Sequence, residues 1–119
     1  MNFSKNADIK ALVVKSIEGQ TMYGELLVKP LIDGDQMTLL ELHYRAGANA
    51  PLHVHTHESL IYVVSGQVKT TVGIKVQLLG PGDACCHPQG IPHTVEAMED
   101  AIVIEIKSPP AELAAFAGT

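Results

Sequence analysis

The sequence predicts an all-β fold, a sandwich or barrel of antiparallel strands, and two observations support this prediction. Runs rich in Val, Ile and Leu recur every eight to twelve residues, and each is bounded by Gly, Pro, Asp or Asn. This spacing is typical of antiparallel sandwiches and barrels. Helical periodicity is absent before residue 110, and only the tail 111–116, after Pro109-Pro110, is expected to form a short C-terminal helical turn.

The apolar runs predict ten strands, in order at 10–18, 21–29, 37–45, 52–55, 59–65, 67–72, 75–79, 84–87, 92–97 and 101–107. Turn-forming residues separate them. Gly34 lies in a turn between two aspartates, Gly66 ends one strand, and Gly73 with Ile74 suits a hairpin. Pro81 lacks a backbone donor, so the segment around it cannot continue a strand ladder.

Length and charge exclude several classes of function. The chain has 119 residues, the size of one domain, and we expect a single domain over 1–119. Eight Lys plus Arg against thirteen Asp plus Glu give a net charge of -5, and without a basic run we expect no nucleic-acid partner. No apolar run approaches the ~20 residues that span a bilayer, and the N-terminus lacks a signal-peptide core. We therefore expect no membrane partner and a cytoplasmic protein.

The histidines hold the strongest chemical signal in the sequence. Residues two apart on an extended strand point to the same face, so His53 and His55, with His57 as a third candidate, are expected to converge. Two histidines rarely complete a metal site, and His93, which follows the stiff turn Pro88–Pro92, is the best further ligand. The alternatives are a solvated polar strand for the pair and a lone surface histidine for His93. All six histidines are His43, His53, His55, His57, His87 and His93.

Two stretches also match, in order and in spacing, a pair of family motifs. The first motif runs Gly, five residues, His-x-His, three or four residues, Glu, six residues, Gly, and its places hold Gly47, His53, His55, Ser59 and Gly66. The second runs Gly, five residues, Pro-x-Gly, two residues, His, three residues, Asn, and its places hold Gly82, Pro88, Gly90, His93 and Ala97. On these residues the sequence resembles the small single-domain cupins of the RmlC-like superfamily. The resemblance covers 47–97, extends with the flanking strands to about 21–108, and implies a cupin jelly-roll β-barrel.

The resemblance implies one divalent transition metal, held in one mouth of the barrel by His53, His55 and His93. At the place of the family's carboxylate ligand stands Ser59, a poor ligand unless deprotonated, so we expect a three-histidine centre. Glu58 can replace that carboxylate only if a bulge shifts the strand by one residue. His57 is a candidate fourth ligand, or an acid beside the metal. Imidazole suits Fe, Zn, Ni and Cu, and the missing carboxylate weakens the case for Mn.

Three imidazoles with open coordination positions are typical of a catalytic rather than a closed structural site. We therefore expect a metal-binding cupin that acts on a small-molecule substrate. The resemblance leaves three alternatives open: an iron-dependent dioxygenase of the three-histidine type, a sugar-acid (uronate) isomerase-like cupin, and a non-catalytic metal-dependent binding or sensing module. The isomerase-like relatives typically carry Gln at the place of Ser59, which weakens that alternative.

Four further residues have candidate roles. Arg45, the only arginine, can bind a substrate carboxylate through two hydrogen bonds if it faces the barrel interior, and is otherwise a solvated strand end. His87, held extended by the proline that follows it, is a candidate cavity-lining residue in contact with substrate. Cys85 and Cys86 are adjacent, so a bridge between them would be strained, and we expect thiols in a reducing compartment.

Unprotected edge strands, together with the pairing of protomers that the resemblance to the family implies, predict a homodimer.

Overall fold

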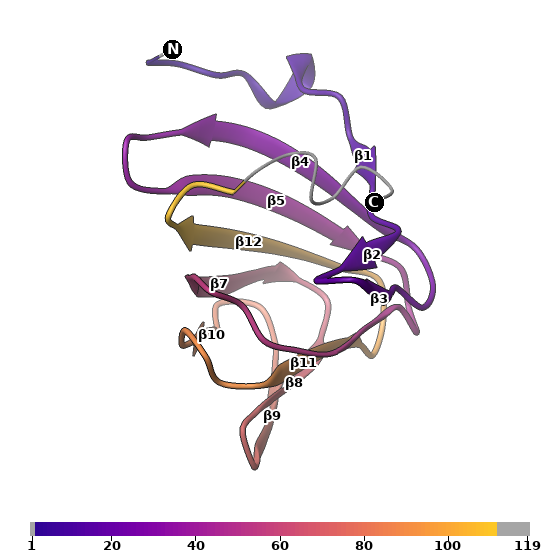
Figure 1. Ribbon diagram of the computed structural model, residues 1–119. Coiled ribbons are helices and arrows are strands. Elements are labelled where there is room, and N and C mark those ends of the chain that lie inside the picture. Colours follow the sequence, from indigo (N-terminus) through magenta and orange to yellow (C-terminus); the bar gives the residue numbers. More distant parts are fainter. Residues whose placement is uncertain (1, 112–119) are drawn as a thin grey trace.

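The computed structural model describes residues 2–111, and within them the regular secondary structure is almost all antiparallel strand, as expected (Figure 1). A six-stranded sheet in this range has the order β1-β4-β5-β12-β7-β10, a four-stranded sheet has the order β6-β11-β8-β9, and β2 pairs with β3. A short 3-10 turn, η1, covers Asn6–Asp8. The strands are β1 (Leu12–Val13), β2 (Ser16–Ile17), β3 (Gln20–Thr21), β4 (Leu26–Asp33), β5 (Thr38–Tyr44), β6 (Asn49–His53), β7 (Glu58–Ser65), β8 (Val68–Val72), β9 (Lys75–Leu79), β10 (Ala84–His87), β11 (His93–Ala97) and β12 (Ala101–Ser108).

Strands that are distant in sequence lie side by side, which is the pattern of a jelly roll. β12 pairs with both β5 and β7, so the last strand lies between the second and third long strands of the six-stranded sheet. Figure 1 shows β4, β5 and β12 as neighbours, with the β8–β9 hairpin at the end of the molecule opposite the N-terminal segment. The two sheets together form the predicted barrel.

The hydrophobic core lies between the sheets and comes from the alternate residues of each strand. On β5 every second residue is buried, because successive side chains point to opposite faces. The larger fully buried apolar side chains come from both sheets and are Leu40, Val28, Val63, Val68 and Val103. The side chains on the outer face of β7 are also apolar. Leu60, Tyr62 and Val64 are each about half exposed, next to the edge strand β10.

The predicted strands from β7 onward agree with the structure to within one residue. The N-terminal predictions agree less well, because the expected strands 10–18 and 21–29 are each interrupted. Gly24 explains the second break: its φ is +76°, and a Cβ atom there would lie 2.8 Å from the Ala48 Cα. The expected helical turn at 111–116 falls almost entirely outside the described residues.

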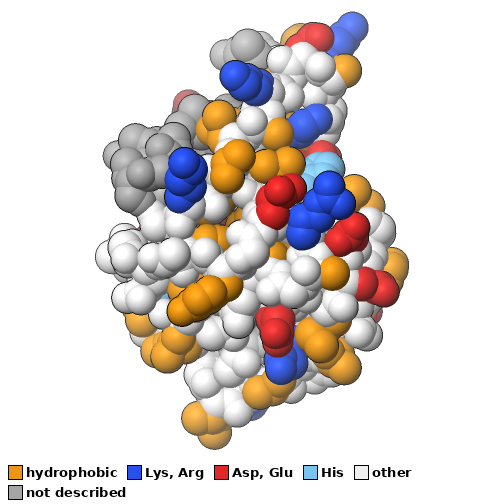
Figure 2. Space-filling model, turned by 90° about the vertical axis from the view of Figure 1, so that its right-hand side faces the viewer, with side chains coloured by type: hydrophobic (Ala, Val, Ile, Leu, Met, Phe, Trp, Pro, Cys, Tyr) orange, Lys and Arg blue, Asp and Glu red, His pale blue; other side chains and the backbone are white. Residues whose placement is uncertain are grey.

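Charged side chains of both signs lie on the face of the molecule that Figure 2 shows. Figure 2 shows one side of the molecule, on which acidic and basic side chains lie interspersed with hydrophobic ones. Within residues 2–111 no helix has the length and apolar character needed to cross a membrane.

Candidate metal centre

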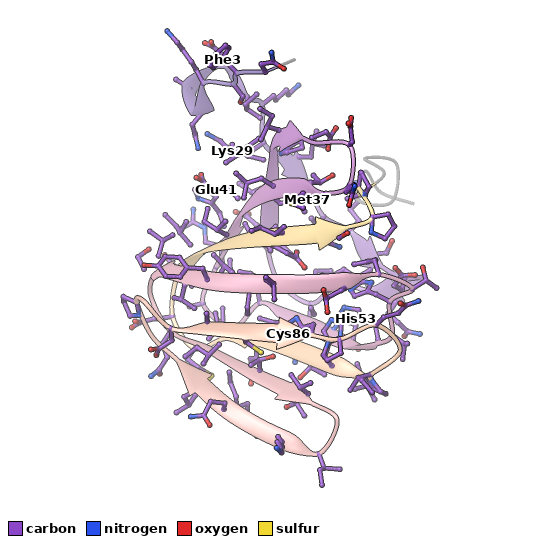
Figure 3. The ribbon with its side chains drawn as sticks, turned by 90° about the vertical axis from the view of Figure 1, so that its left-hand side faces the viewer. Phe3, Lys29, Met37, Glu41, His53 and Cys86 are labelled. Carbon is purple, nitrogen blue, oxygen red and sulfur yellow. The ribbon has the colours of Figure 1, made fainter. Side chains whose placement is uncertain are left out.

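Three of the histidines singled out in the sequence meet inside one end of the barrel. His53 ends β6 and His93 begins β11, and the two residues are direct partners across the β6–β11 pair. His55 follows two residues after β6, and all three side chains are buried. One ring nitrogen from each lies within 4.8 Å of the others. Figure 3 shows His53 near one end of the strands.

His55 reaches this cluster from a loop and not, as the sequence predicted, from a strand spanning 52–55. β6 ends at His53 because its partner β11 begins at His93, so no ladder remains beyond that pair. The loop is instead fixed by the Gly90 backbone N–H, which donates to the His55 carbonyl over 3.1 Å. The two sequence motifs are thereby joined at the backbone as well as through their histidines.

The hydrogen bonds of the three rings determine which nitrogen of each ring keeps its lone pair. His53 Nδ1 lies 2.5 Å from the Pro51 carbonyl, and His93 Nδ1 lies 3.3 Å from the Ile91 carbonyl. His55 Nδ1 lies 2.9 Å from a carboxylate oxygen of Glu18. Carbonyl and carboxylate oxygens only accept, so each Nδ1 carries the proton and donates it. All three Nε2 atoms therefore keep a lone pair, as metal-binding histidines do.

Glu18 is a member of this site that the sequence analysis missed. It occupies the tight turn between β2 and β3, where Ile17 pairs with Gln20, and its φ is 49°. That left-handed conformation is uncommon for a residue other than Gly, Asn or Asp. The adjacent Glu-Gly pair is a turn signal in the sequence, but nothing in the sequence shows that this turn packs against His55.

Burial keeps these rings neutral near pH 7. Burial, and next the positive charge of Lys107, lower the pKa of His55 to about 2. Burial, and next the neighbouring His87, lower the pKa of His93 to about 4. Burial also lowers the pKa of His53, against the opposing effect of its hydrogen bond to Pro51. Neutral imidazole is the form that binds metal, so the cluster has the donor set, tautomers and charge state that a divalent transition metal requires.

The remaining candidates near the metal position differ in their surroundings. Ser59 is 1% exposed, and its Oγ has no hydrogen-bond partner. Glu58 lies on the opposite, exposed face of β7, because no bulge shifts the strand at this point. The buried Nε2 of His57 also has no hydrogen-bond partner, and its ring centroid lies 4.1 Å from that of His55. His57 forms a second group of metal-binding type with His55 and Glu18.

His87 lies inside the barrel beside His93, with the two rings stacked at a centroid distance of 4.1 Å. Its Nε2 lies 2.9 Å from the Thr70 hydroxyl, which donates its one proton to the Thr94 carbonyl. His87 Nε2 is therefore the donor to Thr70, and that nitrogen has no lone pair for a metal. Burial lowers the pKa of His87 to about 4.

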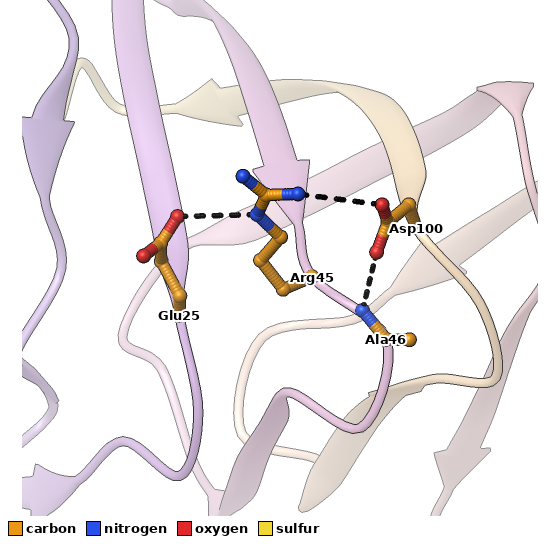
Figure 4. A network of polar contacts seen from close by, with 4 residues as sticks. All are labelled: Glu25, Arg45, Ala46 and Asp100. Carbon is orange, nitrogen blue, oxygen red and sulfur yellow. Dashed lines mark hydrogen bonds and ion pairs between the residues drawn. The ribbon is translucent and has the colours of Figure 1, made fainter.

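Arg45 is not brought to the histidines. Its side chain is 67% exposed and lies 3.4 Å from Glu25 and 3.5 Å from Asp100, while Asp100 also accepts from the Ala46 backbone N–H (Figure 4). These contacts connect the ends of β4 and β5 to the turn before β12. The position is that of a solvated strand end, the second of the two roles that the sequence allowed.

Two neighbouring spaces lie around the histidines. A cavity of about 40 Å³ lies within the barrel, and its walls include the three histidines, His87, Tyr44 and several aliphatic side chains. A pocket of about 360 Å³ at the mouth is lined by Glu18, His57 and Pro110, among others. His55, Ile17 and Lys107 line both spaces, so the two spaces are adjacent.

The family model for the cupin domain matches residues 40–107, more than half of the chain. The chain belongs to the cupin family. Among solved structures, this cupin resembles an RmlC-like cupin from Shewanella frigidimarina, with 23% identity, coverage of 96% of this chain and 95% of the other, and a TM-score of 0.80. KdgF from a Halomonas species is 24% identical, with coverage of 94% and 96% and a TM-score of 0.79.

A predicted oxalate decarboxylase from Thermotoga maritima is 17% identical, with coverage of 89% and 97% and a TM-score of 0.78. No curated protein matches this cupin. The structural likenesses extend over nearly the whole chain and establish the fold, whereas the names of these proteins differ. The particular chemistry of this cupin therefore depends on the side chains that line its own cavity.

Two charged residues of that lining were also missed by the sequence analysis. Glu105 and Lys107 on β12 line the cavity and are 9% and 5% exposed. Ile104 and Ile106 alternate with Glu105 and Lys107 along β12. A rule that buries apolar residues therefore predicts that the isoleucines point inward and the charged residues outward. In the structure the isoleucines are only partly buried and the charged residues point inward.

Proposed function

We propose that this cupin is a metal-dependent enzyme that binds one divalent transition metal through Nε2 of His53, His55 and His93 and acts on a small molecule. The observation that supports the proposal is the set of three Nδ1 hydrogen bonds, which leave three Nε2 lone pairs within one buried cluster. A cluster without metal function has no need for all three tautomers to be fixed in the same sense. The second supporting observation is the cavity into which the cluster opens.

A divalent metal held by His53, His55 and His93 would keep open coordination positions and would supply Lewis-acid chemistry to a substrate oxygen. The chain supplies the rest of the chemistry. Aliphatic side chains make up much of the cavity wall beside the histidines. His57 holds a buried Nε2 without a partner at the mouth, and burial lowers its pKa, so the neutral ring is able to accept a proton from a bound substrate.

The size of the two spaces limits the substrate. The cavity beside the histidines has room for a few atoms, whereas the mouth pocket has room for a small organic molecule. We therefore propose that the reacting end of the substrate enters the cavity and the remainder occupies the mouth. The similar proteins include a predicted oxalate decarboxylase and a polyketide cyclase, names that support an enzymatic role without selecting one reaction.

The experiment that tests the proposal is metal analysis of protein purified without a histidine tag, followed by assays with thiols, diketones and unsaturated uronates. Iron together with oxygen uptake supports a dioxygenase. Zinc or nickel, with no oxygen uptake and with consumption of the uronate, supports an isomerase. Stoichiometric metal without turnover of any of these compounds favours a binding or sensing module and contradicts the enzymatic role.

The cysteines support a proposed cytoplasmic location. Cys85 is partly buried, Cys86 is exposed, and both are free thiols. Burial and the neighbouring Cys86 raise the pKa of the Cys85 thiol, which disfavours the reactive thiolate. Thiols of this kind persist in a reducing compartment.

A further inference from the structure

His57 is the histidine at the mouth of the barrel that the three-histidine cluster does not use. It is not a member of the group in which ring nitrogens of His53, His55 and His93 lie within 4.8 Å of one another. It lines the mouth pocket and not the barrel cavity. Its Nε2 is nevertheless buried, without a hydrogen-bond partner among the described residues. An unpaired buried nitrogen costs free energy, so this atom needs a partner that the folded chain does not provide.

Two metal-binding side chains lie beside this nitrogen. Glu18, His55 and His57 each offer one atom within 4.8 Å of the others, the same spacing as in the three-histidine cluster. The ring centroids of His55 and His57 are 4.1 Å apart, and the Glu18 carboxylate lies 2.9 Å from His55 Nδ1. The group therefore presents two imidazoles and one carboxylate, a donor set that protein zinc sites use.

The charges at the mouth favour a cation in this position. Lys107 is the charged side chain that acts most strongly on the His57 ring, and it is positive. Glu105 and Glu18 follow it, and both are negative. An ion coordinated by Glu18 is in direct contact with that carboxylate, so the attraction exceeds the repulsion from an ammonium group that does not coordinate it. The three-histidine cluster contains no such carboxylate.

We propose that Glu18, His55 and His57 form a second metal position at the mouth, which takes a divalent transition metal of the zinc type. The His55 nitrogen beside Glu18 is Nδ1, so a metal ion in this position replaces the Nδ1 proton, and the neutral ring carries its proton on Nε2 instead. In that tautomer His55 has no lone pair for the three-histidine cluster. The two positions are therefore alternatives for one ion. This second position goes beyond the proposed function and does not depend on it.

The test uses Zn²⁺ and the double variant His53→Ala/His93→Ala, which removes two inner ligands and leaves the mouth group complete. In a titration against a weak chromophoric chelator, we expect this variant to bind one Zn²⁺, more weakly than wild type because Glu18 is exposed to solvent. Adding His57→Phe keeps a ring but removes both nitrogens. It should weaken binding by at least the roughly 10- to 100-fold that loss of a ligand's hydrogen-bond partner costs. Adding His43→Phe is the matched control and should change nothing, because His43 contacts Glu41 and belongs to neither group.

Nitrogen NMR of the imidazole rings in the double variant reports the position directly. Zn²⁺ should move the His55 proton from Nδ1 to Nε2 and should shift the His57 signals. His93→Ala alone, measured in parallel, is a milder change that also leaves the mouth group complete, and adding His57→Phe to it should give the same loss. Absence of Zn²⁺ binding in these variants, or binding that His57→Phe leaves unchanged, would overturn the inference. The three-histidine centre is tested separately, by metal binding to the wild-type protein.

Discussion

The contact between Glu18 and His55 provides a quantitative prediction. The Glu18 carboxylate accepts from His55 Nδ1 over 2.9 Å, and this bond keeps the proton on Nδ1 and the lone pair on Nε2. Removing such a partner typically costs ~10 to 100-fold in metal affinity. Because the Glu18 side chain is 47% exposed, solvent weakens the contact, and we expect Glu18→Ala to lower Zn²⁺ affinity by about tenfold, or about 1.4 kcal/mol.

The backbone at this position separates the role in metal binding from a role in folding. Glu18 adopts a φ of 49°, a conformation that costs a residue with a Cβ roughly 1 kcal/mol more than it costs Gly. Without metal, Glu18→Gly is therefore expected to be more stable than Glu18→Ala, by about 1 kcal/mol or roughly 3 to 5 °C. Both variants lose the carboxylate, so both are expected to lose the same tenfold in Zn²⁺ affinity.

The assay is a competition titration of Zn²⁺ against a chromophoric chelator, with thermal unfolding of the same proteins in excess chelator. Glu25→Ala is the control, because Glu25 is an exposed glutamate that contacts Arg45 and lies away from the histidines. The reasoning is refuted if Glu18→Ala binds Zn²⁺ as tightly as wild type. It is equally refuted if Glu25→Ala shows the same loss.

Three other predictions concern metal preference, pH and assembly. Ser59→Glu should increase the affinity for Mn²⁺ in the same titration, because it adds a carboxylate beside the metal. Ser59→Ala should retain metal. If Ser59→Ala instead loses metal as completely as His53→Ala, Ser59 is itself a ligand. The pKa values of His87 and His93 are about 4 in the folded protein against ~6.5 in the unfolded chain, so without metal the unfolded chain binds more protons between pH 4 and 6.5. The free energy of unfolding should therefore fall as the pH drops through this range, by at most about 3 kcal/mol per ring. Urea unfolding in the presence of chelator that shows equal stability at both ends of the range would contradict this. The exposed apolar side chains of β7 beside the edge strand β10 support a homodimer, and light scattering should give twice the chain mass; a monomer mass at micromolar concentration would exclude it.

The sequence was sufficient to predict the barrel and the three-histidine cluster. The strands are short and bounded by turn residues, so their pattern is visible without tertiary information. His53 and His93 lie in motifs whose glycines and prolines fix the local backbone. In the structure these two histidines are partners across the β6–β11 pair. These features are local or regularly spaced, and for that reason they can be read directly from the sequence.

The missed residues depend on contacts between segments that are distant in sequence. Glu18 reaches His55 only because the β2–β3 turn packs against the mouth of the barrel, 37 residues earlier in the chain. Lys107 was missed for a different reason. Apolar residues occupy both faces of β12, and the rule that places isoleucine inside fails where the interior is a polar site.

The most direct test of the account is metal content after equilibration with one divalent metal and removal of the excess. The wild-type protein and His43→Ala should each retain one equivalent, because His43 contacts Glu41 over 2.7 Å and is not part of the cluster. His53→Ala, His55→Ala and His93→Ala should each lose most of it. Stoichiometric metal in the triple variant would show that the metal binds elsewhere and would contradict the three-histidine centre.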